Sequence, residues 1–223
     1  MAIDCTFLGH SGFILDSGEH RVAIDPFLTG NPIATMAADA VEASAICVTH
    51  GHGDHYADVP GIAKRTNAVV YAPFEICEHL GELGHERCEP ANPGGTIPAP
   101  FGSVTFFGVI HSSSLNGRYL GPACGLVIEI GGVKVCHLGD TSYFSDLKLI
   151  GERYQPDVVM VPIGDRFTMD ARDGSRAAEA IGAKIAIPIH YKTFPMLAQS
   201  ADGFTPAGSE VREMQPGQTI QVG

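Results

Sequence analysis

The densest group of chemically active side chains lies in residues 50–55, which read HGHGDH. Three imidazoles and one carboxylate occur here with only two glycines between them. If these side chains were buried without partners, charged imidazoles would repel one another and neutral ones would leave ring nitrogens without hydrogen bonds. A divalent cation removes both costs, because neutral imidazole and carboxylate are its usual ligands. Since glycine also allows a tight loop, we interpret this segment as a metal-binding loop.

Three further candidate ligands, His111, Asp140 and His190, follow apolar segments that are typical of β-strands. Loops at the carboxyl ends of strands are where α/β proteins build their sites. Strands are predicted over residues 3–8, 13–16, 21–25, 45–49, 68–71, 103–110, 125–130, 133–138, 157–163 and 184–189. Helices are predicted over 56–66, 73–83 and 172–181, with one or two short strands in 209–222. No element is predicted in the Pro/Gly-rich segment 90–102.

Two pairs of segments resemble each other across the chain, and in each pair a predicted strand ends on the same type of residue. These pairs are Gly18–Asp25 with Gly132–Asp140, and Ala43–His50 with Ala183–His190. The length of 223 residues suits one domain. We therefore expect a single domain over residues 1–223, made of two related halves, about 1–110 and 111–223.

The segment THGHGDH at residues 49–55 resembles the HxHxDH motif of the metallo-β-lactamase superfamily, and His111, Asp140 and His190 follow in that family's order. Four shorter segments resemble its compact metal-dependent hydrolase branch, which includes L-ascorbate 6-phosphate lactonase-like proteins. They are LGHSG at 8–12, IDPF at 24–27, PIGDRFTM at 162–169 and IHY at 189–191. The resemblance implies an α/β fold, a four-layer αββα sandwich of two facing mixed β-sheets with the site at one edge.

The same resemblance implies seven ligands for two divalent ions. His50, His52 and His111 are assigned to one ion, Asp54, His55 and His190 to the other, and Asp140 to a bridge between them. Asp54 and Asp140 are also the candidate catalytic residues, because a carboxylate there could carry a proton. The set suits Zn²⁺, Mn²⁺ or Fe²⁺, and imidazole and carboxylate ligands alone do not choose among these metals.

The expected reaction is hydrolysis of a small ester, lactone or phosphorylated metabolite. Two ions about 3.5–4 Å apart lower the pKa of a bound water toward 7 and so supply a hydroxide nucleophile at neutral pH. The alternative is a non-catalytic metal-binding scaffold or sensor. A phosphodiesterase or nuclease and an iron redox protein are further alternatives.

Five more residues are candidates for supporting roles. His10, Arg166 and Lys192 are predicted to contact the substrate; the alternative roles are a solvated turn for His10, an Asp–Arg pair for Arg166 and a solvated side chain for Lys192. Asp25 and His137 end or lie within predicted strands that feed the site. We expect them to hold ligand residues by hydrogen bonds. The alternatives are that Asp25 caps a turn and that His137 is a core residue.

The charge balance restricts the partners of the protein. Fourteen Lys and Arg residues against 25 Asp and Glu residues give a net charge of −11, whereas nucleic-acid binders usually carry a basic face. No apolar run approaches the ~20 residues that span a bilayer, and the first residues do not resemble a secretory signal. The six cysteines form no CxxC pair and are expected to be reduced. We therefore expect a cytoplasmic protein that acts on a small molecule, without nucleic-acid or membrane partners; a homo-oligomer is compatible with the sequence.

Overall fold

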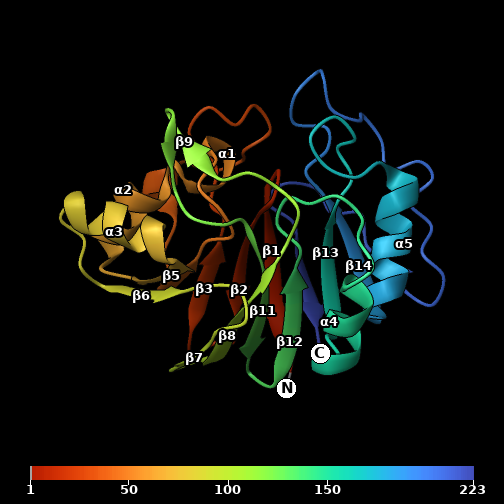
Figure 1. The fold of residues 1–223 in the computed structure, drawn as a ribbon, viewed down its shortest axis with the longest axis horizontal. Helices are drawn as coiled ribbons and strands as arrows, with labels where there is room; N and C mark the ends of the chain where they lie inside the picture. The colour runs from red at the N-terminus through yellow and green to blue at the C-terminus, as the bar shows by residue number, and fades with distance from the viewer. Residues whose placement is uncertain (1) are drawn as a thin grey trace.

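Two seven-stranded β-sheets pack face to face in the computed structural model, which describes residues 2–223. Helices α2 (Val59–Thr66) and α3 (Phe74–Glu82) cover the outer face of the first sheet. Helices α4 (Leu147–Tyr154) and α5 (Ala171–Ile181) cover the outer face of the second sheet (Figure 1). The predicted four-layer αββα sandwich is therefore confirmed.

The first sheet takes its strands mostly from the first 91 residues and one from the end of the chain. In spatial order it contains β16 (Thr219–Val222), β1 (Ile3–Gly9), β2 (Gly12–Asp16), β3 (Arg21–Ile24), β4 (Ala45–Cys47), β5 (Val69–Pro73) and β6 (Cys88–Ala91). Strands β16 to β3 pair in antiparallel fashion, and β3 to β6 pair in parallel.

The second sheet has the same succession of pairings. In spatial order it contains β7 (Thr96–Ala99), β8 (Gly102–Gly108), β11 (Cys124–Ile130), β12 (Val133–His137), β13 (Val158–Pro162), β14 (Ile185–Ile189) and β15 (Glu210–Val211). Strands β7 to β12 are antiparallel, and β12 to β15 are parallel. Because β7 and β8 join the second sheet and β16 joins the first, the sheets do not divide the chain at residue 110. The predicted pseudo-repeated halves stay a prediction.

Side chains alternate between the two faces of each strand, so the buried apolar residues form three separate cores. In β3, Val22 and Ile24 point between the sheets, whereas Ala23 points toward the helices on the outer face. In β13, Val158 lies between the sheets and Val159 lies against the helices on the other side. A strand that is apolar on both faces is typical of a sheet covered on both sides, and this explains the continuous apolar runs of the sequence.

Several short elements differ from the prediction. The predicted helix 56–66 is two helices, α1 (Gly53–Tyr56) and α2, with Pro60 in the first turn of α2, where its missing N–H costs nothing. Strands β6 and β7, helix α4, the 3₁₀ turn Ala38–Ala40 and the ribbon of β9 (Ser114–Leu115) and β10 (Arg118–Tyr119) also form. The sequence does not predict α4 because this helix contains Gly151, and glycine weakens helices. A Cβ there would lie 2.3 Å from the Ile181 carbonyl oxygen, so the glycine permits close packing on α5.

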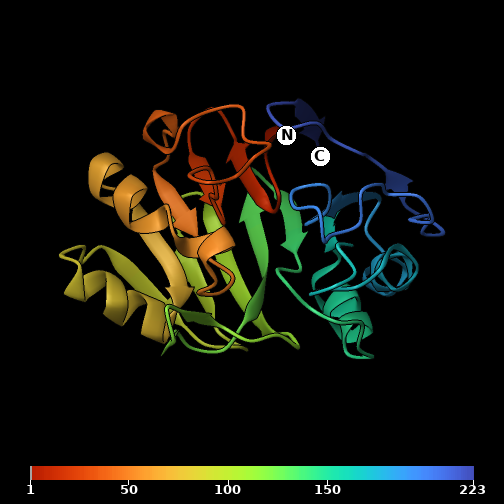
Figure 2. The ribbon, with the colours of Figure 1, turned by 90° about the horizontal axis from the view of Figure 1, so that it is seen from above.

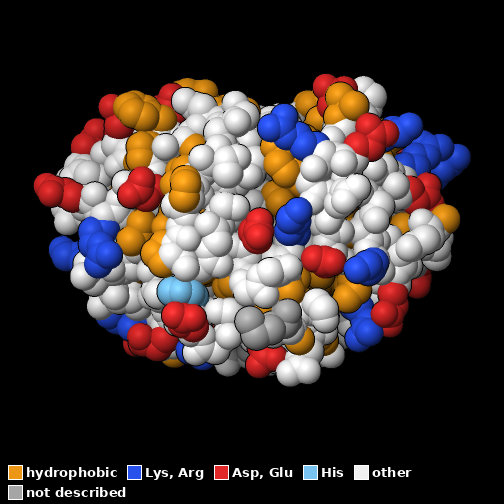
Figure 3. All heavy atoms as spheres, turned by 90° about the horizontal axis from the view of Figure 1, so that it is seen from below, with side chains coloured by type: hydrophobic (Ala, Val, Ile, Leu, Met, Phe, Trp, Pro, Cys, Tyr) orange, Lys and Arg blue, Asp and Glu red, His pale blue; other side chains and the backbone are white. Residues whose placement is uncertain are grey.

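The carboxyl ends of β12 and β13 point to the upper edge of the molecule in Figure 1. Figure 2 looks down on this edge and shows the red strands of the first sheet facing the green strands of the second, with the teal and blue elements to the right. The opposite end, in Figure 3, carries acidic and basic side chains scattered among apolar ones. None of the helices within residues 2–223 combines the length and apolar character that crossing a bilayer requires.

Replacing Phe106 with alanine tests the central core. Its side chain is fully buried between the sheets, so Phe106→Ala is expected to lower the free energy of unfolding by about 3–5 kcal/mol. The matched control is Phe74→Ala, because Phe74 is 46% exposed, and it should stay within about 0.5 kcal/mol of the parent. Urea denaturation measures both; equal losses in the two variants would contradict this packing.

Candidate metal centre

The candidate ligands come from loops at one edge of both sheets. In the first sheet, β4 leads into the loop of residues 50–55, whose last residues begin α1. In the second sheet, β8 leads to His111, β12 to Asp140 and β14 to His190. Because the two sheets face each other, the edge where β4 ends is brought against the edge where β12 and β14 end.

All seven predicted ligands lie together in two groups. Within each group, the ligand atoms all lie within 4.8 Å of one another. The groups are His50, His52, His111 and Asp140, and His10, Asp54, His55 and His190. In the first, Nδ1 of His52 lies 3.0 Å from Nε2 of His50 and 3.3 Å from Nε2 of His111. The assignment of individual ions to these groups stays a prediction.

The Asp140 carboxylate lies between the two groups and is 2% exposed. Its Oδ2 is 3.5 Å from Nε2 of His111 and 3.1 Å from Nε2 of His190, while its Oδ1 is 3.3 Å from Nε2 of His55. One carboxylate thus faces imidazoles of both groups, as the predicted bridging role requires.

Asp25 fixes the orientation of two of these imidazoles and is fully buried. Its Oδ2 accepts a hydrogen bond from Nδ1 of His55 at 2.7 Å and another from the Thr49 hydroxyl at 2.5 Å. Since that hydroxyl donates its proton to Asp25, it accepts from Nδ1 of His50, 3.0 Å away. Both imidazoles therefore carry their proton on Nδ1 and present the Nε2 lone pair to the centre. This is the ligand-holding role predicted for Asp25.

The resulting arrangement of lone pairs fits a cation. Nε2 of His55 and Oδ1 of Asp140 are buried, face each other at 3.3 Å, and have no hydrogen-bond partner within residues 2–223. Both atoms are acceptors once Asp25 holds the proton of His55 on Nδ1. Two buried acceptors without a donor are costly, and a divalent cation bound by imidazole and carboxylate satisfies both.

Burial keeps several imidazoles ready to act as ligands. It lowers the pKa of His50, His52 and His111 from their usual value, so the neutral form that binds metals prevails at pH 7. Burial also acts to lower the pKa of His55, but the carboxylates of Asp140 and Asp25 outweigh it, and the pKa of His55 is raised. The two carboxylates thus favour positive charge at this imidazole.

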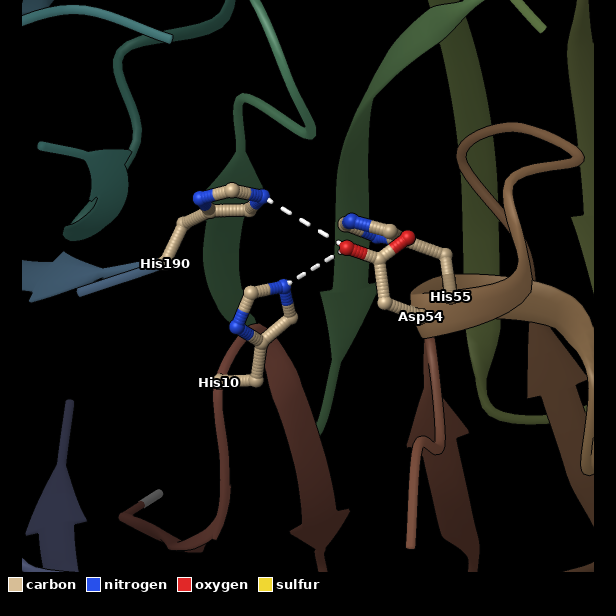
Figure 4. A group of neighbouring side chains, drawn as sticks. All are labelled: His10, Asp54, His55 and His190. Carbon is tan, nitrogen blue, oxygen red and sulfur yellow. Dashed lines mark hydrogen bonds and ion pairs between the residues drawn. The ribbon is translucent and has the colours of Figure 1, made fainter. Parts of the chain in front are cut away.

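Figure 4 shows how the second group is arranged around the carboxylate of Asp54. Nε2 of His10 lies 3.1 Å and Nε2 of His190 lies 3.8 Å from Oδ2 of Asp54. Nδ1 of His10 is 2.8 Å from the hydroxyl of Thr193. Because His10 is fully buried and its ring lies beside Asp54, it supports that carboxylate; the predicted contact of His10 with substrate stays a prediction.

The other two predicted substrate residues contact side chains outside the two ligand groups. A cavity of about 290 Å³ opens over the cluster and is lined by His52, Asp54, His111, Ser112, Asp140, Phe167 and His190. Arg166 is absent from this lining within the described chain, and its guanidinium lies 5.7 Å from the Phe167 ring. The ammonium of Lys192 lies 3.9 Å from a Glu213 carboxylate oxygen. Phe167, which the sequence analysis passed over, is the side chain of that loop at the cavity.

His137 holds the segment that carries Asp140. Its Nε2 donates to the Ser11 carbonyl at 2.8 Å, and its Nδ1 accepts from the Gly139 N–H at 3.0 Å. These two bonds join the end of β12 to the turn between β1 and β2. The predicted supporting role of His137 therefore acts through the backbone beside Asp140 rather than through a ligand imidazole.

The backbone is strained at several positions of the centre. His10, Asp25 and His190 have φ angles of 58°, 40° and 59°, which L-residues rarely adopt. Such strain persists only where surrounding contacts impose it, and it concentrates at functional sites. Gly164 also allows a close approach, because a Cβ there would lie 2.2 Å from the His190 carbonyl oxygen and 2.8 Å from its Nδ1.

A sandwich of two facing mixed sheets with a His/Asp cluster at one edge defines the metallo-β-lactamase fold class. Residues 20–191 match the family described as Beta-lactamase superfamily domain. The chain belongs to this superfamily and, within it, to the UPF0173 metal-dependent hydrolases, as its similarity to curated relatives shows. The family predicted from the HxHxDH motif is confirmed.

Three similar proteins illustrate this membership. A UPF0173 metal-dependent hydrolase of Shouchella clausii is 40% identical over 225 residues, which cover 97% of this chain and 99% of the relative. Igni18, a metallo hydrolase from Ignicoccus hospitalis, has a solved structure with a TM-score of 0.90 at 30% identity, covering 99% of this chain and 98% of that one. YhfI from Bacillus subtilis, a metallo-beta-lactamase fold protein, has a TM-score of 0.75 at 18% identity, covering 99% and 100%, and shares the fold.

Changing Asp25 to asparagine tests its control of the imidazoles. The amide has one acceptor oxygen where the carboxylate has two, so its NH2 group must face either the Thr49 N–H or the donors of His55 and the Thr49 hydroxyl. Asp25→Asn is therefore expected to weaken metal binding about 10–100-fold. Competition with a chelator measures the affinity. Asp4→Asn, an exposed change on β1, is the control, and an unchanged affinity in Asp25→Asn would refute the orienting role.

Changing Gly164 to alanine tests the close approach to His190. The added Cβ must displace the His190 backbone and ring, so the variant is expected to bind less metal while its circular dichroism spectrum stays that of the parent. Gly61→Ala is the control, because a Cβ at that position of α2 meets no atom within 4 Å. Full metal content in Gly164→Ala would show that His190 does not need this approach.

Proposed function

We propose that this chain is a hydrolase that uses two divalent metal ions to cleave an ester or lactone bond in a small molecule. One observation carries the proposal: two groups of ligand atoms meet at a single buried carboxylate, Asp140, and open on a cavity. A closed structural metal site has no such opening, whereas a catalytic site keeps a position free for water or substrate.

When bound, two such ions would supply a hydroxide nucleophile at neutral pH and polarise the carbonyl group of the substrate. Asp140 and the imidazoles around it would hold the ions. His55 and His50, kept in one tautomer by Asp25 and Thr49, direct their lone pairs to the same place throughout the reaction.

Asp54 is the residue that we assign to proton transfer. Its side chain is 29% exposed and lines the cavity, whereas that of Asp140 is almost fully buried. Burial acts to raise the pKa of Asp54, but the hydrogen bond from His10 and the nearby imidazoles outweigh it and lower the pKa. The carboxylate is therefore ionised at neutral pH, and its position at the cavity, rather than its basicity, supports the assignment.

The remaining functional alternatives make different demands on the same residues. A metal-binding scaffold or sensor needs the ligands but not the cavity, and an iron redox protein needs an oxidant or reductant. A nuclease needs cations along a phosphate backbone, which a net charge of −11 does not favour. We also propose zinc or manganese as the metals and the cytoplasm as the location, where the six free cysteines would stay reduced.

Metal removal and readdition test the proposed activity. The purified chain is treated with a chelator, reloaded with Mn²⁺ or Zn²⁺, and assayed on chromogenic esters and lactones. Activity should vanish with the chelator and return with the metal. His52→Ala should lower kcat/KM by more than about 100-fold, since loss of supporting residues alone costs about 10–100-fold.

His20→Ala is the control for this variant, because His20 lies at the β2–β3 turn outside both ligand groups. Tightly bound metal without turnover of any ester or lactone would favour the scaffold. A reaction that depends on O₂ would favour the redox protein.

A further inference from the structure

The cavity over the metal centre is small and has no cationic wall. Its volume is about 290 Å³, roughly twice that of a cavity of ~150 Å³ that binds benzene. Its lining consists of three imidazoles, two carboxylates, Ser112 and the Phe167 ring, and within residues 2–223 neither lysine nor arginine contributes to it. A substrate of this size would therefore meet the metal-ligand side chains on one side and an aromatic ring on the other.

Phe167 is held in place although it is exposed. The residue is 56% exposed at the cavity. Its loop is fixed by hydrogen bonds from the Gly164 N–H to the Thr168 hydroxyl at 3.1 Å and from the Asp165 N–H to the Met169 carbonyl at 2.9 Å. When an apolar group covers an exposed aromatic ring, the burial of apolar surface favours binding. Because the loop that carries the ring is already ordered, little entropy is lost on binding.

A second exposed apolar residue flanks the centre. Ile110 directly precedes His111 and is 58% exposed. Its N–H donates to the Thr141 hydroxyl at 3.2 Å, and its carbonyl accepts from the Ser142 N–H at 3.4 Å. The backbone of Ile110 is thus joined to the two residues that follow Asp140, so apolar surface borders the centre at two separate loops.

The two cationic side chains predicted to contact the substrate are absent from this lining within residues 2–223. The guanidinium of Arg166 lies against the Phe167 ring at 5.7 Å, and Lys192 pairs with Glu213. Recognition of a phosphate or carboxylate normally uses a charged donor that forms two hydrogen bonds to it. Such a donor is missing from the cavity lining among the described residues.

We infer that the part of the substrate that does not react is apolar and uncharged, an aryl or short acyl group that packs on Phe167. Given the proposed hydrolase activity, on which this inference rests, the substrate class is a neutral ester or lactone. This class leaves out metabolites whose non-reacting part carries a phosphate, which the sequence alone left open.

Two esters that differ in one charge test the inference on the full chain loaded with Mn²⁺ or Zn²⁺. They are 4-nitrophenyl butyrate, with a neutral acyl chain, and mono-4-nitrophenyl succinate, with an anionic one of similar length. Because the succinate carboxylate attacks its own ester, the rate without protein is subtracted for both. The neutral ester is expected to have a kcat/KM at least tenfold higher. Phe167→Ala should raise its KM about tenfold with little change in kcat, and Arg166→Gln should change neither ester more than about twofold.

Phe74→Ala on α3 controls for loss of an exposed phenylalanine. Equal or faster hydrolysis of the succinate ester, together with a higher KM for it in Arg166→Gln, would overturn the inference and assign Arg166 to an anionic substrate. An unchanged KM for the butyrate ester in Phe167→Ala would also overturn it.

A binding measurement separates this inference from the proposed hydrolase activity. Acetanilide and the anion succinanilate are stable amides, and titration calorimetry measures their binding to the metal-loaded chain. Acetanilide that binds more tightly than succinanilate, and more weakly to Phe167→Ala, supports apolar recognition even if neither ester is cleaved, in which case the proposed activity fails alone. Preference for succinanilate, or binding of neither probe, would overturn the inference.

Discussion

The placement of one buried carboxylate among several imidazole lone pairs is the constraint on which the centre depends. Asp140 lies within 3.5 Å of ring nitrogens from three different loops, and its Oδ1 has no donor within residues 2–223. Such an arrangement costs free energy unless positive charge enters it. The surrounding structure maintains it through the sheet edges, which set the loop positions, and through Asp25, which prevents the proton of His55 from moving to Nε2.

The two sheets contribute unequal parts to this arrangement. The first sheet supplies the HGHGDH loop together with Asp25, so the ligands there and the residue that orients them lie on neighbouring strand ends. The second sheet supplies ligands one at a time, from the ends of separate strands. The ligands of the 50–55 loop therefore derive their geometry from local sequence, whereas Asp140 and His190 derive theirs from packing between sheets, supported by His137 and by the close approach of Gly164.

Much of this could be predicted from sequence, because the main signals are local. The ligand-rich loop occupies six consecutive residues, and the buried strands are long apolar runs. Strands β6 and β7 escaped prediction because they are short and contain Pro90 and Pro98, which suits positions near a sheet edge. The burial of His10 and the position of Phe167 also escaped, since both depend on contacts between residues far apart in the chain.

The pairing of β1 with β16 joins residues that are distant in sequence and are therefore synthesised at different times. Thr6 and Thr219 bond through their side chains across 213 positions. At about 5–20 residues per second, a ribosome makes Thr219 roughly 10–40 seconds after Thr6. During that interval β1 has an open edge to which strands of other chains can add. This edge of β1 is therefore an aggregation hazard of the nascent chain until β16 covers it.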